Sequence, residues 1–182
     1  MLMAGADSAR GVLDGQYPQV ADALTAMGHM VLQVPFDADL IEVDLDGFVT
    51  GTAAIGQTIE GNVYRPGSVV DNLTSFGAVP QNFQADGESQ VSVARWVQQG
   101  VAAVHGTTHE PLNICFPHRQ FLVDHASGFT IGESYHRNLP FVFWQNLVVG
   151  DVMAAPHARR PTLELTRSAA DGEGEEVLIF TA

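Results

Sequence analysis

Short apolar runs alternate along this chain with segments in which apolar residues recur at helical spacing. The runs are bounded by glycine or proline and are too short for helices, so buried strands are predicted at residues 30–34, 47–50, 68–70 and 101–104. Helices are predicted at residues 17–28, 89–99, 117–126 and 130–138, the last with Thr130 as N-cap and Glu133 completing a capping box. Strands that are apolar throughout are buried on both faces, so this order predicts an α/β fold with a mostly parallel sheet flanked by helices.

The end of the chain has a different pattern. Residues 162–166 alternate strictly between apolar and polar side chains, residues 175–181 do so roughly, and a polar segment separates them. This arrangement predicts a C-terminal β-hairpin. We therefore expect residues 1–158 to form the α/β domain and residues 159–182 to form a terminal extension.

Charge and composition exclude some classes of partner. The 182 residues carry a net charge of −13, and all eight basic residues are arginines, so nucleic acid is not an expected partner. The longest apolar stretch, residues 139–149, is far shorter than the ~20 residues that span a bilayer, so no transmembrane segment is predicted. The first residues lack the basic start of a secretion signal, which leaves two compartments open: the bacterial cytoplasm, or export after removal of a signal.

Two polar segments follow predicted strands and are the best candidates for a ligand-facing rim. Residues 71–77 follow the strand at 68–70, and residues 105–111 follow the strand at 101–104. Ligands of open parallel sheets bind at the carboxyl ends of the strands. The two segments converge if their strands are neighbours, which short connections favour.

A cluster of histidines makes a metal site one hypothesis. Five of the seven histidines lie between residues 105 and 136. His105, His109, Cys115 and His118 are ligand types that zinc or another transition metal prefers. Their spacing matches no established metal motif, so the alternative is that the histidines are hydrogen-bonded or solvated loop residues.

Four side chains are candidates for catalysis: Asp71, Ser75, Glu110 and Cys115. Cys115 could be a nucleophile with a nearby histidine as base, although a lone cysteine between apolar neighbours is commonly a small buried hydrophobe. Ser75 could join a histidine and Asp71 in a triad, but it lacks the Gly-x-Ser-x-Gly turn. Asp71 and Glu110 could form a carboxylate pair for acid/base work or for a hard metal ion; the alternative is that Asp71 caps a turn.

Three segments resemble a poorly characterised group of bacterial proteins. They are Pro66-Gly67-Ser68-Val69-Val70-Asp71-Asn72-Leu73-Thr74-Ser75-Phe76-Gly77, Ala103-Val104-His105-Gly106-Thr107-Thr108-His109-Glu110-Pro111, and Gly132-Glu133-Ser134-Tyr135 followed by Asn146-Leu147-Val148-Val149-Gly150-Asp151. Together they cover about residues 60–156. That group is similar to the C-terminal part of caspase-like cysteine peptidases of the gingipain and clostripain type. The resemblance implies a caspase-like α/β fold, of which residues 1–158 would be the C-terminal part.

The resemblance does not carry the peptidase activity with it. In those peptidases one strand ends in His-Gly and the next ends in Cys. Here Thr50 precedes Gly51 in place of the histidine, the strand ending at Asp71 has no cysteine near it, and Cys115 lies well past the nucleophile position. The resemblance therefore implies a caspase-like scaffold that lacks the His/Cys dyad.

Three classes of function remain open at this point, and they leave undecided whether the protein is an enzyme. The first is a non-peptidase binding or assembly module, a subunit of a complex or homo-oligomer, favoured by the missing dyad and by the apolar stretch 139–149. The second is a metal-dependent site, with zinc or another transition metal, that could be hydrolytic. The third is a peptidase-like hydrolase that uses Cys115 or Ser75.

Overall fold

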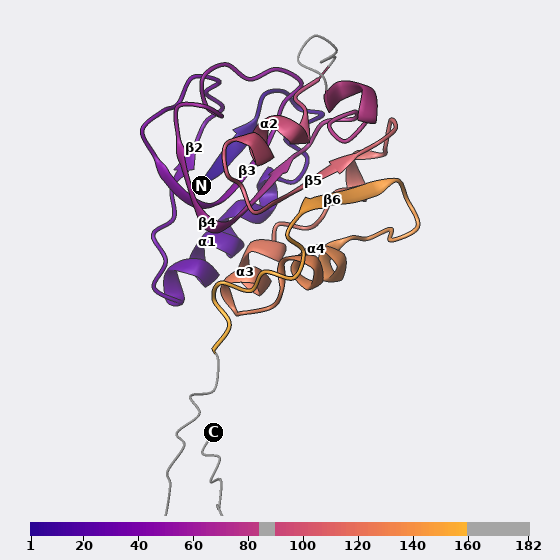
Figure 1. Cartoon of the computed structure of the whole chain (residues 1–182). Coiled ribbons are helices and arrows are strands. Elements are labelled where there is room, and N and C mark those ends of the chain that lie inside the picture. Colours follow the sequence, from indigo (N-terminus) through magenta and orange to yellow (C-terminus); the bar gives the residue numbers. More distant parts are fainter. Residues whose placement is uncertain (84–89, 160–182) are drawn as a thin grey trace, which may run out of the picture.

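A six-stranded sheet forms the centre of the protein (Figure 1). The computed structural model describes residues 1–83 and 90–159. The strand order is β2-β1-β3-β4-β5-β6; the first five strands run parallel, and β6 is antiparallel to β5. The strands are β1 (Leu2–Gly5), β2 (Gln33–Val34), β3 (Asp44–Gly51), β4 (Val63–Asn72), β5 (Ala103–Thr107) and β6 (Asn146–Gly150). The predicted α/β class with a mostly parallel sheet is confirmed.

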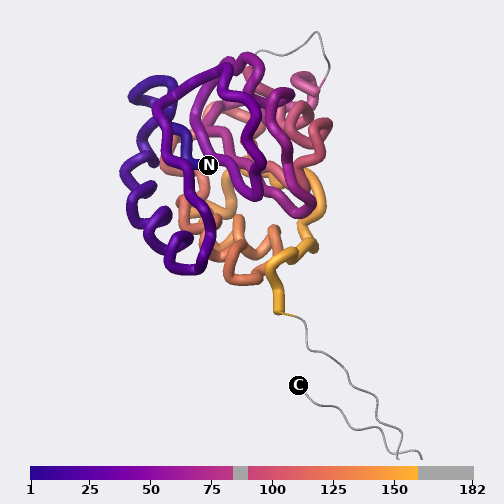
Figure 2. Tube along the Cα trace, turned by 90° about the vertical axis from the view of Figure 1, so that its left-hand side faces the viewer, coloured from indigo at the N-terminus to yellow at the C-terminus, as the bar shows by residue number. Residues whose placement is uncertain are grey.

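Helices cover both faces of the sheet. The α-helices are α1 (Tyr17–Ala26), α2 (Val93–Gln98), α3 (Phe121–Ala126) and α4 (Ile131–Asn138), and the 3₁₀ turns are η1 (Asp14–Gln16), η2 (Pro80–Phe83) and η3 (Asn113–Cys115). Helices α1, α3 and α4 pack together on one face, and α2 packs on the other. Figure 2 shows α3 and α4 side by side beneath the sheet.

The central strands explain why the apolar runs are continuous. On β3, β4 and β5, side chains alternate between two cores: Val49, Val69 and Ala103 face α1, α3 and α4, whereas Phe48, Val70 and Val104 face α2. All six are fully buried. A strand that is buried on both faces has no solvent-facing side chains, so its sequence is an unbroken apolar run.

The predicted helices have the right positions, but three are shorter than predicted. The helix predicted at 17–28 ends at Ala26, and Gly28, with a φ of 90°, closes it as expected for a glycine C-cap. The helices predicted at 89–99 and 117–126 begin four residues late, at Val93 and Phe121. The capping box that begins α4 is present as predicted.

The outer strands and the chain end depart most from expectation. The strand predicted at 30–34 is reduced to Gln33–Val34 at the sheet edge, and Met30 is 97% exposed. Strands β1 and β6 were not predicted, because neither is an apolar run bounded on both sides by glycine or proline. Residues 160–182, which include the predicted hairpin, lie outside the described residues, so the antiparallel pair seen here is β5 with β6. None of the helices in the described ranges has the length and apolar character needed to cross a membrane.

Candidate functional site

The two polar segments predicted to form a rim do converge. Their strands, β4 and β5, are neighbours, and the register places Asp71 directly beside His105. Asp71 and Asn72, which were predicted to follow the strand at 68–70, are instead the last two residues of β4. Likewise, His105, Gly106 and Thr107 belong to β5. These polar side chains therefore sit inside the sheet rather than on a loop above it.

A buried hydrogen-bonded network links β4, β5 and β6. His105 Nδ1 donates to Asp71 Oδ1 over 2.7 Å, and His105 Nε2 lies 2.9 Å from Asn146 Oδ1. The other carboxylate oxygen, Asp71 Oδ2, accepts from Arg119 Nη1. Asp71, His105 and Arg119 are all fully buried. Both ring nitrogens of His105 and both carboxylate oxygens of Asp71 are thus engaged within the protein.

Arg119, like Asn146, is a residue of this network that was not among the candidates predicted from the sequence. It lies just before α3, in a stretch predicted to be helical, and no motif marks it as different from other arginines. Burial alone would raise the pKa of Asp71, but the charge of Arg119 and the His105 hydrogen bond outweigh it and hold that pKa below its usual range. The same pairing raises the pKa of Arg119 despite its burial. The pair is therefore ionised at neutral pH.

Aromatic side chains enclose the network. The ring of Tyr135 stacks on His105 with centroids 6.1 Å apart, and Phe116 meets the same imidazole edge-on at 5.4 Å. The Tyr135 hydroxyl donates to the carbonyl of Val70 over 2.7 Å, so it too is occupied. Asp71, His105 and Arg119 have no solvent-exposed surface in this structure. The arrangement can hold β4, β5 and the loop before α3 in register, but it presents no reactive atom to solvent.

The remaining catalytic candidates do not join the network. Ser75 Oγ donates to Glu110 Oε1 over 2.8 Å, which links the two converging loops at the surface. A triad of Ser75 with a histidine and Asp71 is therefore not assembled, because the histidine bound to Asp71 contacts Asn146 instead. Asp71 and Glu110 do not form a carboxylate pair either: Asp71 is enclosed with Arg119, whereas Glu110 is exposed. Cys115 is a buried free thiol, as expected for a small hydrophobe.

The four predicted metal ligands have different surroundings. His105 uses both ring nitrogens in the buried network, Cys115 is buried, and His109 and His118 are exposed. The ring of His109 lies against Phe76, with centroids 6.5 Å apart. Across residues 1–83 and 90–159, no three histidine, cysteine, aspartate or glutamate side chains stand ready as a group that could hold a metal ion. Clustering in the sequence therefore does not translate into convergence in space.

Comparison with known proteins adds no family to this picture. No family model, no curated protein and no solved structure matches the chain. We therefore infer the function of this chain from its own residues.

Proposed function

We propose that this protein is a non-peptidase assembly module on a caspase-like scaffold, and that it self-associates through the outer edge of β6. One observation carries the proposal: β6 is an uncharged edge strand next to strongly exposed apolar side chains. A soluble domain ordinarily protects such an edge.

The backbone of β6 has one side paired and one side turned outward. Asp151 donates to the carbonyl of Ala102, and the carbonyl of Gln145 accepts from Thr108, so the odd-numbered residues of this strand face β5. The alternate residues Val148 and Gly150 direct their backbone groups away from β5. No other strand in the described part of the chain pairs with that side. These groups form a template on which a further strand can add.

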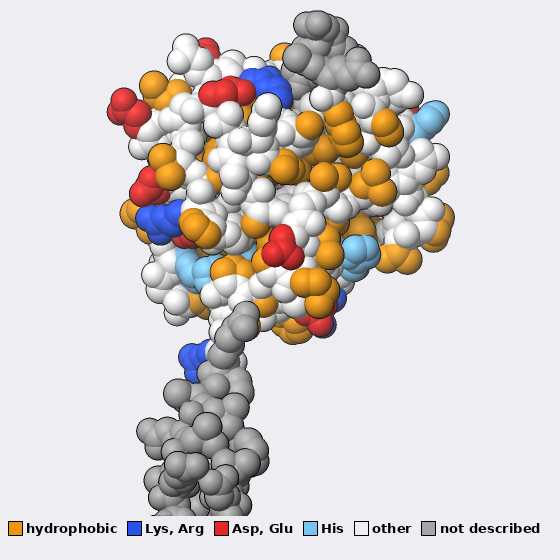
Figure 3. Space-filling view, viewed as in Figure 1, with side chains coloured by type: hydrophobic (Ala, Val, Ile, Leu, Met, Phe, Trp, Pro, Cys, Tyr) orange, Lys and Arg blue, Asp and Glu red, His pale blue; other side chains and the backbone are white. Residues whose placement is uncertain are grey.

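The side chains around this edge include none of the charged residues that usually protect an edge strand from pairing. Residues 139–150 contain no charged residue. Phe143 is 81% exposed, Val142 68% and Leu147 44%, and Figure 3 shows apolar side chains gathered on the half of this face that carries β5 and β6. The opposite edge of the sheet is different, because β2 has only two residues and offers little to pair with. Exposed edges are normally blocked by charge, proline or shortness, and β6 has none of these within its span.

A second copy of this chain is the occupant that the surface fits best. Two β6 strands related by a two-fold axis pair antiparallel, so the same surface serves both partners, which is how most homo-oligomers form. Two copies that each carry a net charge of −13 repel each other over most of their surface. The uncharged segment 139–150 lets two copies approach each other there with little repulsion. Pairing also covers the exposed rings and aliphatic side chains beside the edge.

The positions that hold the dyad in the resembling peptidases support a role other than proteolysis. Thr50 lies near the end of β3 and Asp71 near the end of β4, and both side chains are fully buried. Thr50 donates its hydroxyl to the carbonyl of Ala4 over 3.2 Å, which joins β3 to β1. Residues that would carry chemistry in a peptidase instead join strands here.

Sedimentation equilibrium of the wild-type protein and Phe143→Glu tests the proposal. We expect the wild type to form dimers, and we expect the variant to dimerise at least about tenfold more weakly, a change of about 1.4 kcal/mol, because the new carboxylate faces its own copy across an apolar contact. The matched control is Val12→Glu, which adds the same charge at an exposed apolar residue outside β6. A wild type that stays monomeric at high concentration, or equal weakening in both variants, would contradict the proposed surface.

A further inference from the structure

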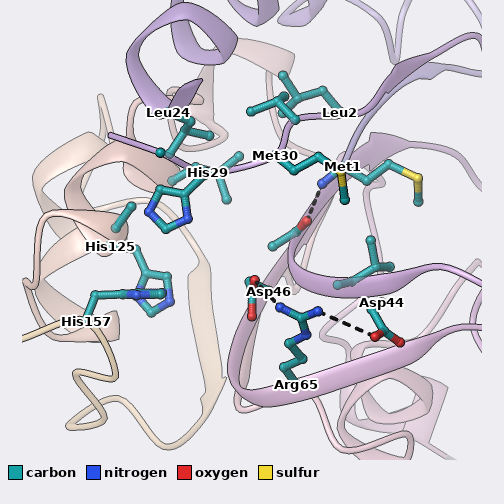
Figure 4. Close-up of a pocket in the computed structure, with 16 residues that line it drawn as sticks. Met1, Leu2, Leu24, His29, Met30, Asp44, Asp46, Arg65, His125 and His157 are labelled. Carbon is teal, nitrogen blue, oxygen red and sulfur yellow. Dashed lines mark hydrogen bonds and ion pairs between the residues drawn. The ribbon is translucent and has the colours of Figure 1, made fainter. Parts of the chain in front are cut away.

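A cavity of about 260 Å³ opens at the end of the sheet opposite to the Asp71 network. Three of its lining residues are histidines that come from distant parts of the chain and meet on one wall (Figure 4). His29 follows α1, His125 lies in α3, and His157 follows β6. The rings of His125 and His157 have centroids 5.1 Å apart, and those of His29 and His157 are 5.5 Å apart. His157 therefore stands between the other two imidazoles.

The segment that follows β6, residues 151–158, carries the central histidine of this cluster. It contains no helix or strand, and backbone hydrogen bonds hold it against the start of α4. The amide of Ile131 donates to the carbonyl of Ala154 over 2.9 Å. The amide of Gly132 donates to the carbonyl of Val152 over 2.8 Å. These two amides therefore report whether the segment is in place.

His125 lies where this segment meets α3 and β4. Only 3% of the residue is exposed, and the ring has a backbone hydrogen bond with Gly67 in β4. Pro156 packs so closely on Gly67 that a Cβ there would lie 2.6 Å from the proline Cγ. The close packing of the segment thus helps to keep the imidazole of His125 away from water.

The charged groups that face the cluster are divided between both signs. Asp46 lies across the cavity from the three rings, and it contacts Arg65 over 3.3 Å (Figure 4). Arg65 also contacts Asp44, over 3.5 Å. The amino group of Met1 lines the same cavity and donates to the carbonyl of Gly47 over 2.6 Å. The positive charge of Arg65 offsets part of the attraction that the two carboxylates exert on a protonated imidazole.

The rings resist protonation while the segment is in place. Burial, and next the neighbouring ring of His157, lower the pKa of His125 to about 4, although the hydrogen bond with Gly67 and the charge of Asp46 act in the opposite direction. Burial and His29 likewise lower the pKa of His157. An imidazole exposed to water has a pKa of about 6.5. The closed structure therefore binds fewer protons than an opened one, so its stability is complete above pH ~6.5 and declines as the pH falls toward ~4.

We propose that His29, His125 and His157 form an acid-sensitive switch: neutral imidazoles let residues 151–158 pack on α3 and α4, and protonation in mildly acidic solution releases that segment. Rings about 5 Å apart repel each other strongly when charged, and burial leaves this repulsion weakly screened. Helix α3 is fixed in the core by the buried ring of Phe121, whereas the segment is irregular and half-exposed, so the segment is the part that moves. The switch does not require pairing through β6.

Amide hydrogen exchange of the full chain at about pH 7.5 and about pH 5, expressed as protection factors, tests this switch. We expect the protection of the Ile131 and Gly132 amides to fall by at least about tenfold at the lower pH. The difference between a pKa of about 6.5 and one of about 4 at His125 alone allows an increase in opening of up to about 30-fold over this range. The amide of Val104, in the central sheet, should keep its protection.

Three variants show which rings are responsible. His125→Gln removes the most deeply buried titrating ring and should reduce the fall in protection to about threefold or less, and His157→Gln should reduce it by at least about half. His157 is half-buried, so His157→Gln keeps the test valid even where the core variant unfolds. The matched control His109→Gln removes an exposed imidazole at the other end of the sheet and should behave as the wild type does. The Met1 amino group is the same in every variant, so its titration cancels in these comparisons.

Several outcomes would overturn the switch. One is an equal fall in protection in the wild type and in His157→Gln. Another is an equal loss of protection at Val104, because the chain would then unfold as a whole. A fall that disappears in His109→Gln would overturn the switch too, since the titrating group would lie outside the cavity.

Discussion

At the scale of single residues, Asp71 is the centre of the buried hydrogen-bonded network. It accepts from His105 and Arg119 at once, and all three residues are fully buried. A buried ion pair is not in itself a large source of stability, but removal of one partner leaves an uncompensated charge in the core. The charge that loses its partner when Asp71 is removed is that of Arg119.

We expect Asp71→Asn to lower the free energy of unfolding by about 3–5 kcal/mol at pH 7, the usual effect of breaking a buried ion pair. The pKa of Asp71 is lower in the folded state than in the unfolded chain, so its contribution is complete above pH ~4 and declines as the pH falls. The difference between wild type and variant should therefore narrow by up to about 1.4 kcal/mol for each pH unit below ~4. Urea denaturation at pH 7 and at lower pH measures both effects.

Asp22→Asn is the matched control for this prediction, because Asp22 is exposed on α1. It should change stability by less than about 0.5 kcal/mol, as surface substitutions usually do. A loss in Asp71→Asn no larger than that in the control would show that the Asp71–Arg119 pair does not support the core.

The sequence indicated part of this network and missed the rest. Asp71 and His105 stand out because each directly follows an apolar strand, and neighbouring parallel strands bring such positions together. Arg119 and Asn146 reach the same place from the loop before α3 and from β6, 48 and 41 residues away from their partners. Patterns within a short stretch of sequence do not predict contacts between residues so far apart in the chain.

At the scale of elements, α4 connects local sequence signals to the network. Thr130 Oγ1 accepts from the Glu133 amide over 3.2 Å, and the Glu133 carboxylate accepts from the Thr130 amide over 2.9 Å. This reciprocal pair fixes where the helix begins. The helix in turn places Tyr135 against His105 and under the carbonyl of Val70. A cap at the surface thus helps to position a ring in the core.

Thr130→Ala should lower the free energy of unfolding by about 1 kcal/mol, the typical effect of losing an N-cap oxygen. Thr130→Ser keeps the hydroxyl and should lose clearly less. Urea denaturation of the two variants beside the wild type gives the comparison. Equal losses in both would mean that the threonine methyl group, and not the capping hydrogen bonds, is what matters at this position.

The elements also show which parts of the fold are readable from sequence. Central strands and capped helices were predicted because both leave local signatures: continuous apolar runs for the strands, and glycine or a capping box for the helix ends. Strands β1 and β6 are defined by what they pair with, and β6 also requires Gly150, where a φ of 130° and the nearby Ala102 carbonyl leave no room for a Cβ. Edge strands of this kind depend on tertiary context, which short windows of sequence do not contain.

At the scale of the whole molecule, the protein combines a net charge of −13 with an uncharged, partly apolar edge strand, β6. Asp71, His105 and Arg119 are fully buried, so they cannot contact a partner directly. Contacts with other molecules therefore depend on the features that face solvent. Those features include the β6 surface, with exposed Leu147 in the strand and exposed Phe143 just before it. We propose above that the β6 edge pairs with a second copy of the chain.

Amide hydrogen exchange of β6 at two protein concentrations tests that claim most directly, because it reports on the outward backbone groups themselves. If β6 pairs with a second copy, the amides of Val148 and Gly150 exchange slowly in concentrated protein and faster on dilution, while the amides of Leu147 and Val149, which face β5, change little. Pairing also predicts that Phe143→Glu removes the concentration dependence. Equal exchange rates for Val148 and Gly150 at both concentrations would contradict pairing through this edge.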